Sequence, residues 1–140
     1  MPESLVLFAE DDDEDWMLFE EALGQQCPYS VGYERVRDGK ALLQRLQDPE
    51  KALPDVVVLD LRMPRMDGRS TLRAIRANEV FRHLPVVMMT TSKLEADILD
   101  SYREGANSYI VKPVTFEEMG NLFRDLHHYW FTRVSLPRSG

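Results

Sequence analysis

The sequence lacks the features that are typical of secreted, membrane-spanning and nucleic-acid-binding proteins. Its one cysteine, Cys27, cannot form an internal disulfide, which fits a reducing compartment. No apolar run approaches the roughly 20 residues that a bilayer-spanning helix needs, and the chain opens without the basic stretch of a secretory signal. A formal net charge of −7 disfavours nucleic acid as a partner, because phosphate binding needs clustered Lys and Arg. We therefore expect a cytoplasmic protein without membrane or nucleic-acid partners.

What the sequence contains instead is an alternation of short apolar runs and amphipathic segments. Four runs are β-branched or continuously apolar, as in strands buried on both faces: 5–9, 56–59, 86–89 and 109–111. A fifth segment, 29–36, alternates in polarity and predicts a strand at the sheet edge. Helical patterns lie between and after these runs: a stripe from Leu18 that Asp12 or Asp13 can cap, segments 39–48, 70–80 and 95–105, and a stripe from Phe116 to Trp130 behind a Thr115–Glu118 capping box. Five alternations of strand and helix predict a doubly wound α/β fold, with a five-stranded parallel sheet and helices on both faces.

Polar side chains follow four of the predicted strands at the point where each strand ends. Glu10 and Asp11 follow the run 5–9, and Asp60 follows the run 56–59. Thr90 follows the run 86–89, and Lys112 follows the run 109–111. Parallel strands end along one rim, where ligands of such sheets bind. Carboxylates suit Mg²⁺, while Lys and Thr suit anionic oxygens. Each residue alone has an ordinary explanation, such as a helix dipole or a turn, but together they indicate a cation and phosphate site.

Four motifs carry a resemblance to a known family. They are "AEDD" (9–12), "VVVLDLRMPRMDG" (56–68), "PVVMMTTS" (85–92) and "GANSYIVKP" (105–113). In this order they resemble the receiver domain of two-component response regulators, from residue 5 to about 129. The resemblance implies a flavodoxin-like strand order of 2-1-3-4-5, a receiver domain over 1–129 and a tail over 130–140.

The chemistry implied by this resemblance centres on Asp60. It would accept a phosphoryl group from a phosphohistidine of a sensor histidine kinase, while Lys112 and Thr90 contact phosphoryl oxygens. The implied protein ligands of a Mg²⁺ ion are Asp11, Asp60, the backbone carbonyl of Arg62, and Glu10 through a water molecule. Positioning and electrostatics do most of the work in phosphoryl transfer, so we expect the domain to catalyse its own modification and slow dephosphorylation rather than act as a conventional enzyme.

The acidic run 10–15 raises the question of what offsets its repulsion, about 1 kcal/mol per pair in water. We expect Glu10 and Asp11 to face the metal ion, and the remaining acids, Asp12 to Asp15, to serve the helix start and the solvent.

Further residues match positions with known roles in receivers. Thr90 and Tyr109 are expected to form a switch that remodels the surface of residues 95–130, and the backbone N–H of Thr91 is expected to contact phosphate. Arg62 and Ser92 stand where receivers tune hydrolysis, and we expect the long Arg62 side chain to prolong the life of the phosphoprotein.

Two structural expectations accompany these roles. The Lys112–Pro113 peptide bond resembles the cis bond of the family. Gly68 is expected to let the loop after Asp60 pass close to the metal site.

The tail is similar to that of stand-alone receivers that pair with phytochrome-type histidine kinases, including bacteriophytochromes. Its apolar residues would lose burial if left in water: Trp130, Phe131, Val134 and Leu136. They can fold back on their own core or pack against a second subunit, and we expect a homodimer. Output would pass through protein contacts.

Three other classes of protein share part of this pattern. A flavin carrier of the same architecture would need a Ser/Thr-rich phosphate loop where this chain has acids. An aspartate-dependent phosphohydrolase would need a second acid in place of Arg62. The serious alternative is a pseudo-receiver that is never phosphorylated and acts as a structural adaptor. It would normally have lost one of four residues that this chain keeps: Asp11, Asp60, Thr90 and Lys112.

Overall fold

The computed structural model describes residues 4–26 and 30–137 and confirms the predicted architecture. Its five strands form one parallel sheet in the order β2-β1-β3-β4-β5. The strands are β1 (Ser4–Ala9), β2 (Val31–Val36), β3 (Val56–Leu59), β4 (Val86–Thr90) and β5 (Ser108–Val111). The helices are α1 (Asp13–Gln26), α2 (Gly39–Gln47), α3 (Gly68–Ala77), α4 (Glu95–Arg103), α5 (Phe116–His128) and a π-helix, η1 (Tyr129–Arg133). Cys27, the first residue of the predicted strand 29–36 and residues 138–140 of the predicted tail lie outside the described residues.

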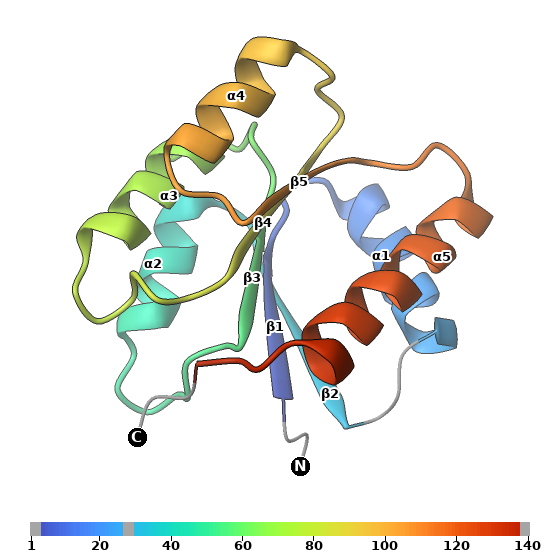
Figure 1. The fold of residues 1–140 in the computed structure, drawn as a ribbon, viewed down its shortest axis with the longest axis horizontal. Helices are drawn as coiled ribbons and strands as arrows, with labels where there is room; N and C mark the ends of the chain where they lie inside the picture. Colours follow the sequence, from blue (N-terminus) through green and yellow to red (C-terminus); the bar gives the residue numbers. More distant parts are fainter. Residues whose placement is uncertain (1–3, 27–29, 138–140) are drawn as a thin grey trace.

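The sheet separates two helical layers, because its central strands are apolar on both faces. Helices α1 and α5 cover one face, and α2, α3 and α4 lie on the other (Figure 1). On the first face, the rings of Phe19 and Phe123 meet edge to face with their centroids 5.4 Å apart. On the second, Leu42, Leu72 and Ile75 are fully buried against β1, β3 and β4. The two cores hold the strands in register and so place their carboxyl ends side by side.

Side-chain caps set where several helices begin. The Asp12 carboxylate, one of the two caps that the sequence allows for α1, accepts a hydrogen bond from the Asp15 N–H at 2.9 Å. The Thr115 hydroxyl accepts one from the Glu118 N–H at 3.1 Å, as predicted. Helix α3 begins two residues before the predicted position, because Asp67 accepts a hydrogen bond from the Ser70 N–H. The α4 end is followed by Gly105 with a φ of 108°, a conformation that favours glycine.

The segment after α5 turns back toward the sheet (Figure 1). Trp130, Phe131 and Leu136 are half-buried and pack against the core between the sheet, α1 and α5. Val134 is also half-buried. Trp130, Phe131 and Leu136 of the tail therefore pack on the core of their own chain.

Among the helices of the described residues, none has the length and apolarity required to cross a membrane.

Candidate functional site

The register of the sheet brings the predicted site residues together. Ala9 pairs with Leu59 across β1 and β3, so Glu10 and Asp60 follow adjacent strand ends. The Lys112 N–H donates to the Thr90 carbonyl at 2.8 Å, which ties the end of β5 to the end of β4. The strand ends consequently bring four of the predicted polar residues to one rim: Glu10, Asp60, Thr90 and Lys112.

Lys112 lies at the centre of this rim and contacts three carboxylates. Its Nζ donates to Glu10 Oε1 at 2.6 Å, to Asp60 Oδ2 at 2.7 Å and to Asp15 Oδ2 at 2.8 Å. These contacts use all three donors of the ammonium group. The side chains of Lys112, Glu10 and Asp60 are only 7%, 3% and 10% exposed. One buried cation therefore faces more negative charge than it can balance.

Burial and hydrogen bonds together set the pKa values of this group. Burial raises the pKa of Glu10 to about 7, although its hydrogen bond to Lys112 acts in the opposite direction. Burial disfavours the charged form of Lys112, but hydrogen bonds to Asp15, Asp60 and Glu10 outweigh it and raise the pKa of the lysine. The lysine is thus held protonated, and the site favours any further positive charge.

The carboxylates that could bind a metal cation lie close together. Carboxylate oxygens of Glu10, Asp11 and Asp60 lie within 4.8 Å of one another. Asp11 is exposed, while the other two are buried, so the group opens to solvent on one side. Hard oxygen donors at this spacing fit Mg²⁺, which binds through one or two carboxylates and keeps several waters.

The loop after Asp60 turns back tightly over the site. The Arg62 N–H donates to Asp60 Oδ1 at 3.3 Å, and the Gly68 N–H donates to the Leu61 carbonyl at 2.8 Å. A Cβ at Gly68 would overlap the Asp60 carbonyl, so the close approach requires glycine. Arg65 adopts a φ of 66° in the same loop. Gly68 therefore has the structural position that the sequence predicts.

Thr90 and Tyr109 lie on the neighbouring strands β4 and β5. Thr90 is buried, and its Oγ1 lies 3.5 Å from the Ser92 N–H. The Tyr109 hydroxyl donates to the Ser92 carbonyl at 2.9 Å, and burial raises the pKa of this tyrosine. Thr91 is exposed beside them. The two predicted switch residues are thus linked through the backbone of Ser92.

Two sequence predictions require correction. No cis peptide bond occurs among residues 4–26 and 30–137, so the Lys112–Pro113 bond is trans. Trans is the form that an X-Pro bond prefers by about 0.5–1 kcal/mol, and Lys112 reaches all three carboxylates with it. The second correction concerns Asp15, which is expected only at the helix start and in solvent: it lies in the first turn of α1, but its carboxylate also accepts a hydrogen bond from Lys112 Nζ at 2.8 Å.

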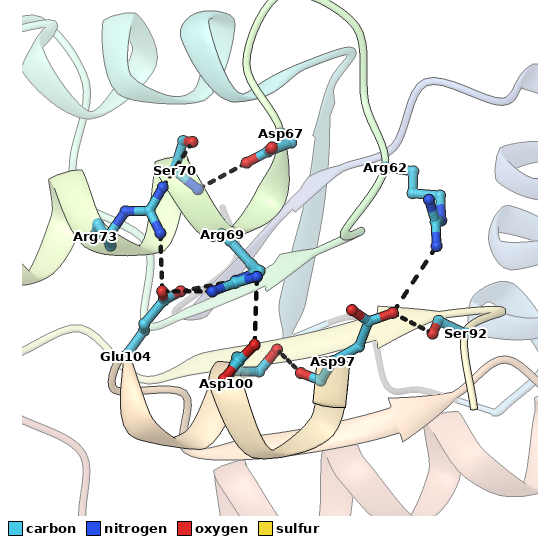
Figure 2. Close-up of polar contacts among 10 residues, drawn as sticks. Arg62, Asp67, Arg69, Ser70, Arg73, Ser92, Asp97, Asp100 and Glu104 are labelled. Carbon is cyan, nitrogen blue, oxygen red and sulfur yellow. Dashed lines mark hydrogen bonds and ion pairs between the residues drawn. The ribbon is translucent and has the colours of Figure 1, made fainter. Parts of the chain in front are cut away.

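Sequence reasoning also missed Asp97, in the first turn of α4. Its Oδ2 accepts a hydrogen bond from Ser92 Oγ at 2.5 Å and lies 3.9 Å from Arg62 Nη2 (Figure 2). Its position near a helix start gave it an ordinary explanation, and nothing in the sequence placed α4 beside the loop after Asp60.

A doubly wound sheet with acids, a hydroxyl and a lysine at its carboxyl rim defines an α/β domain suited to a hard cation and an anionic group. The sequence matches the family described as response regulator receiver domain over residues 6–124. It is 36% identical over 129 residues to the probable methanogenesis regulatory protein FilR2 of Methanothrix harundinacea, over 90% of this chain and 83% of FilR2. It is 30% identical over 142 residues to the response regulator Rcp1 of Synechocystis sp., over 97% of this chain and 95% of Rcp1.

Solved structures agree with these relatives. The phosphorylated cyanobacterial phytochrome response regulator RcpA superposes with a TM-score of 0.88 at 29% identity, over 96% of this chain and 99% of RcpA. The Mn²⁺-bound form of Rcp1 gives a TM-score of 0.87 at 29% identity, with the same coverage. This chain belongs to the response regulator receiver domain family.

Proposed function

We propose that this receiver domain accepts a phosphoryl group on Asp60 from a phosphohistidine of a sensor histidine kinase. The observation that carries the proposal is the position of the Lys112 Nζ, 2.7 Å from Asp60 Oδ2 in a buried, acid-rich pocket. A protonated lysine at this point can pair with the negative charge of an incoming phosphoryl group. The phosphorylated state named for the relative RcpA supports the same chemistry in this chain.

In the transfer, an Asp60 carboxylate oxygen bonds to phosphorus while the bond between phosphorus and the donor imidazole nitrogen breaks. The electron pair of the broken bond returns to the imidazole, which then takes up a proton. Lys112 pairs with one phosphoryl oxygen, the Thr90 hydroxyl donates to another, and the Thr91 N–H supplies a further donor. Asp60 is already held in place by Lys112 on one oxygen and by the Arg62 N–H on the other.

The donor set fits a Mg²⁺ ion held by Asp11, Asp60 and the backbone carbonyl of Arg62, with Glu10 acting through a water molecule. When bound, the ion supplies positive charge that offsets the excess of carboxylates and the added phosphate. The spacing of the three carboxylates supports this assignment, because oxygens of Glu10, Asp11 and Asp60 lie within 4.8 Å of one another. The Mn²⁺-bound form of Rcp1 is a relative with a divalent cation.

Phosphorylation must alter a surface if it is to carry a signal. We infer that Thr90 moves toward the phosphoryl group and that Tyr109 turns inward behind it, so that the surface of residues 95–130 changes. The hydrogen bond from Tyr109 to the Ser92 carbonyl would then break or shift. A Tyr109→Ala variant whose oligomeric state responds normally to phosphate would contradict this switch.

We further propose a phytochrome-type partner kinase and a homodimer through α5 and the tail. The phytochrome response regulator RcpA supports the kinase class. Half-buried Trp130, Phe131, Val134 and Leu136 retain apolar area for a second subunit. Sedimentation at micromolar concentration, with and without phosphate, measures the assembly. A monomer in both conditions would contradict the dimer.

The phosphoacceptor role is tested by intact mass. Wild type incubated with Mg²⁺ and acetyl phosphate should gain the mass of one phosphoryl group, and Asp60→Asn, which keeps the shape of the side chain, should gain none. Chelation of Mg²⁺ should prevent the gain in wild type. A folded wild-type chain that gains no mass with Mg²⁺ present would support the pseudo-receiver instead.

A further inference from the structure

A single carboxylate, that of Asp97, contacts both the loop that follows β3 and the loop that follows β4. Its Oδ2 accepts the Ser92 hydroxyl at 2.5 Å, and the same oxygen lies 3.9 Å from Arg62 Nη2. Figure 2 shows Arg62 reaching down from the loop after β3 and Ser92 lying beside Asp97 at the start of α4. Ser101 Oγ donates to the Asp97 backbone carbonyl at 2.7 Å, which anchors this turn of α4.

Both partners of Asp97 are continuous with the phosphoacceptor site. The Arg62 N–H donates to Asp60 Oδ1, and Ser92 follows Thr90 by two residues, with its N–H 3.5 Å from Thr90 Oγ1. Any change in how Asp97 holds these side chains therefore acts directly beside the atoms that would bear and contact the phosphoryl group.

The two contacts differ in strength. The Ser92–Asp97 hydrogen bond is short, and the Asp97 side chain is only 22% exposed, so this contact is the firm one. The Arg62 side chain is 74% exposed and its ion pair is long, so the guanidinium is held loosely. Arg62 and Asp97 also line one open cleft together with Asp11. The pair thus lines a cleft that also reaches Asp11 of the acidic site.

Resting on the proposed function, we propose that Asp97 is a positioning residue that prolongs the life of phospho-Asp60 by holding Arg62 across this cleft. In hydrolysis, a water oxygen bonds to phosphorus, and the bond from phosphorus to the Asp60 oxygen breaks with its electron pair returning to the carboxylate. Inorganic phosphate leaves and one proton passes to solvent. An arginine held across the cleft limits the approach of that water.

A double-mutant cycle tests the proposal. Wild type, Asp97→Asn, Arg62→Ala and the double variant are phosphorylated with acetyl phosphate and Mg²⁺, freed of donor, and followed by intact mass as the phosphate is lost. Asp97→Asn should lose phosphate about threefold faster than wild type, within the range that an exposed ion pair contributes. The double variant should decay no faster than Arg62→Ala alone, because the two residues act as one unit.

Two further variants separate positioning from general damage to the fold. Asp97→Glu keeps the charge and should decay within about twofold of wild type. Asp100→Asn makes the same change one turn along α4, at a residue that pairs with Arg69 instead, and should decay at the wild-type rate. Added salt should accelerate the loss of phosphate from wild type, because screening weakens the ion pair between Arg62 and Asp97. It should leave the rate of phosphate loss in Asp97→Asn unchanged.

An unchanged decay rate in Asp97→Asn, or an equal acceleration of decay when Arg62 is already alanine, would overturn this inference alone. A wild-type chain that never gains the phosphate mass would overturn it together with the proposed function.

Discussion

Two groups of ion pairs differ in how they shift the pKa of a glutamate: that of Glu10 is raised, and that of Glu104 is lowered. In the buried group, Lys112 contacts Glu10, Asp15 and Asp60 at 2.6 to 2.8 Å. In the second group, which we call the α3–α4 seam, four residues pair at 2.8 to 3.5 Å: Arg69, Arg73, Asp100 and Glu104 (Figure 2). The buried contacts are as short as those of the seam or shorter, so longer distances cannot explain why the pKa of a buried carboxyl is raised.

Burial and the balance of charges account for the opposite pKa shifts in the two groups. The buried group sets one cation against three carboxylates, and burial raises the pKa of Glu10 to about 7. The seam matches two arginines with two acids, and the hydrogen bond from Arg69 lowers the pKa of Glu104. The pKa values of two glutamates that both contact cations thus shift in opposite directions. The carboxyl whose pKa is raised is the one that is buried away from water.

The largest effect is expected from Lys112→Met. Without the cation, Glu10 and Asp60 are left buried and unpaired, and the free energy of unfolding in metal-free buffer at pH 8 should fall by about 3 kcal/mol. Denaturant titration measures the loss. Part of it should be recovered as the pH is lowered, because burial raises the pKa of Glu10, the loss of Lys112 raises it further, and the protonated carboxyl needs no cation.

The matched control for this variant lies in the seam. Arg69→Met also removes a cation that contacts carboxylates, but at a side chain that is 35% exposed. Its cost should be less than about 1 kcal/mol. Equal losses for the two variants would show that burial does not distinguish the two groups.

The second effect is a pH dependence of Mg²⁺ affinity. Divalent cations bind the ionised carboxylate, and the pKa of Glu10 near 7 means that this form is lost as the pH falls through 7. Affinity measured by calorimetry should be about tenfold weaker at pH 6 than at pH 8. In Glu10→Gln the affinity should change little over this range, and a wild-type affinity that stays constant would contradict the raised pKa.

The smallest effect is expected from Glu104→Gln, which breaks the seam at its shared acid. Its free energy of unfolding should fall by about 0.5–1 kcal/mol at neutral pH and low salt. Because the pKa of Glu104 is lowered on folding, this stabilisation is present above pH 4.5 and disappears as the pH falls below it. Thermal unfolding at several salt concentrations should show the difference shrinking with salt, whereas a salt-independent loss would point to packing.

Residues that directly follow strands could be located from the sequence. Glu10, Asp60 and Lys112 were predicted to converge, because apolar runs locate the strands and parallel strands end at one rim. Asp15 and Asp97 could not be located in this way. Both lie in the first turn of a helix, where an acid has a routine role, and whether such a side chain reaches the site depends on how the helix packs.

The sequence by itself determined the doubly wound sheet, the strand order carried by the family motifs, and the set of polar residues at the rim. The sheet and the rim residues follow from local apolar patterns and from a topology that leaves few choices, whereas the strand order was implied by the resemblance to receiver domains. Only the tertiary structure decided that Lys112 binds three acids with a trans peptide bond before Pro113, that Asp97 joins Arg62 to Ser92, and that the tail packs on its own core. These contacts depend on helix rotation and side-chain burial, which arise from packing between distant segments and are not encoded in any short stretch of the chain.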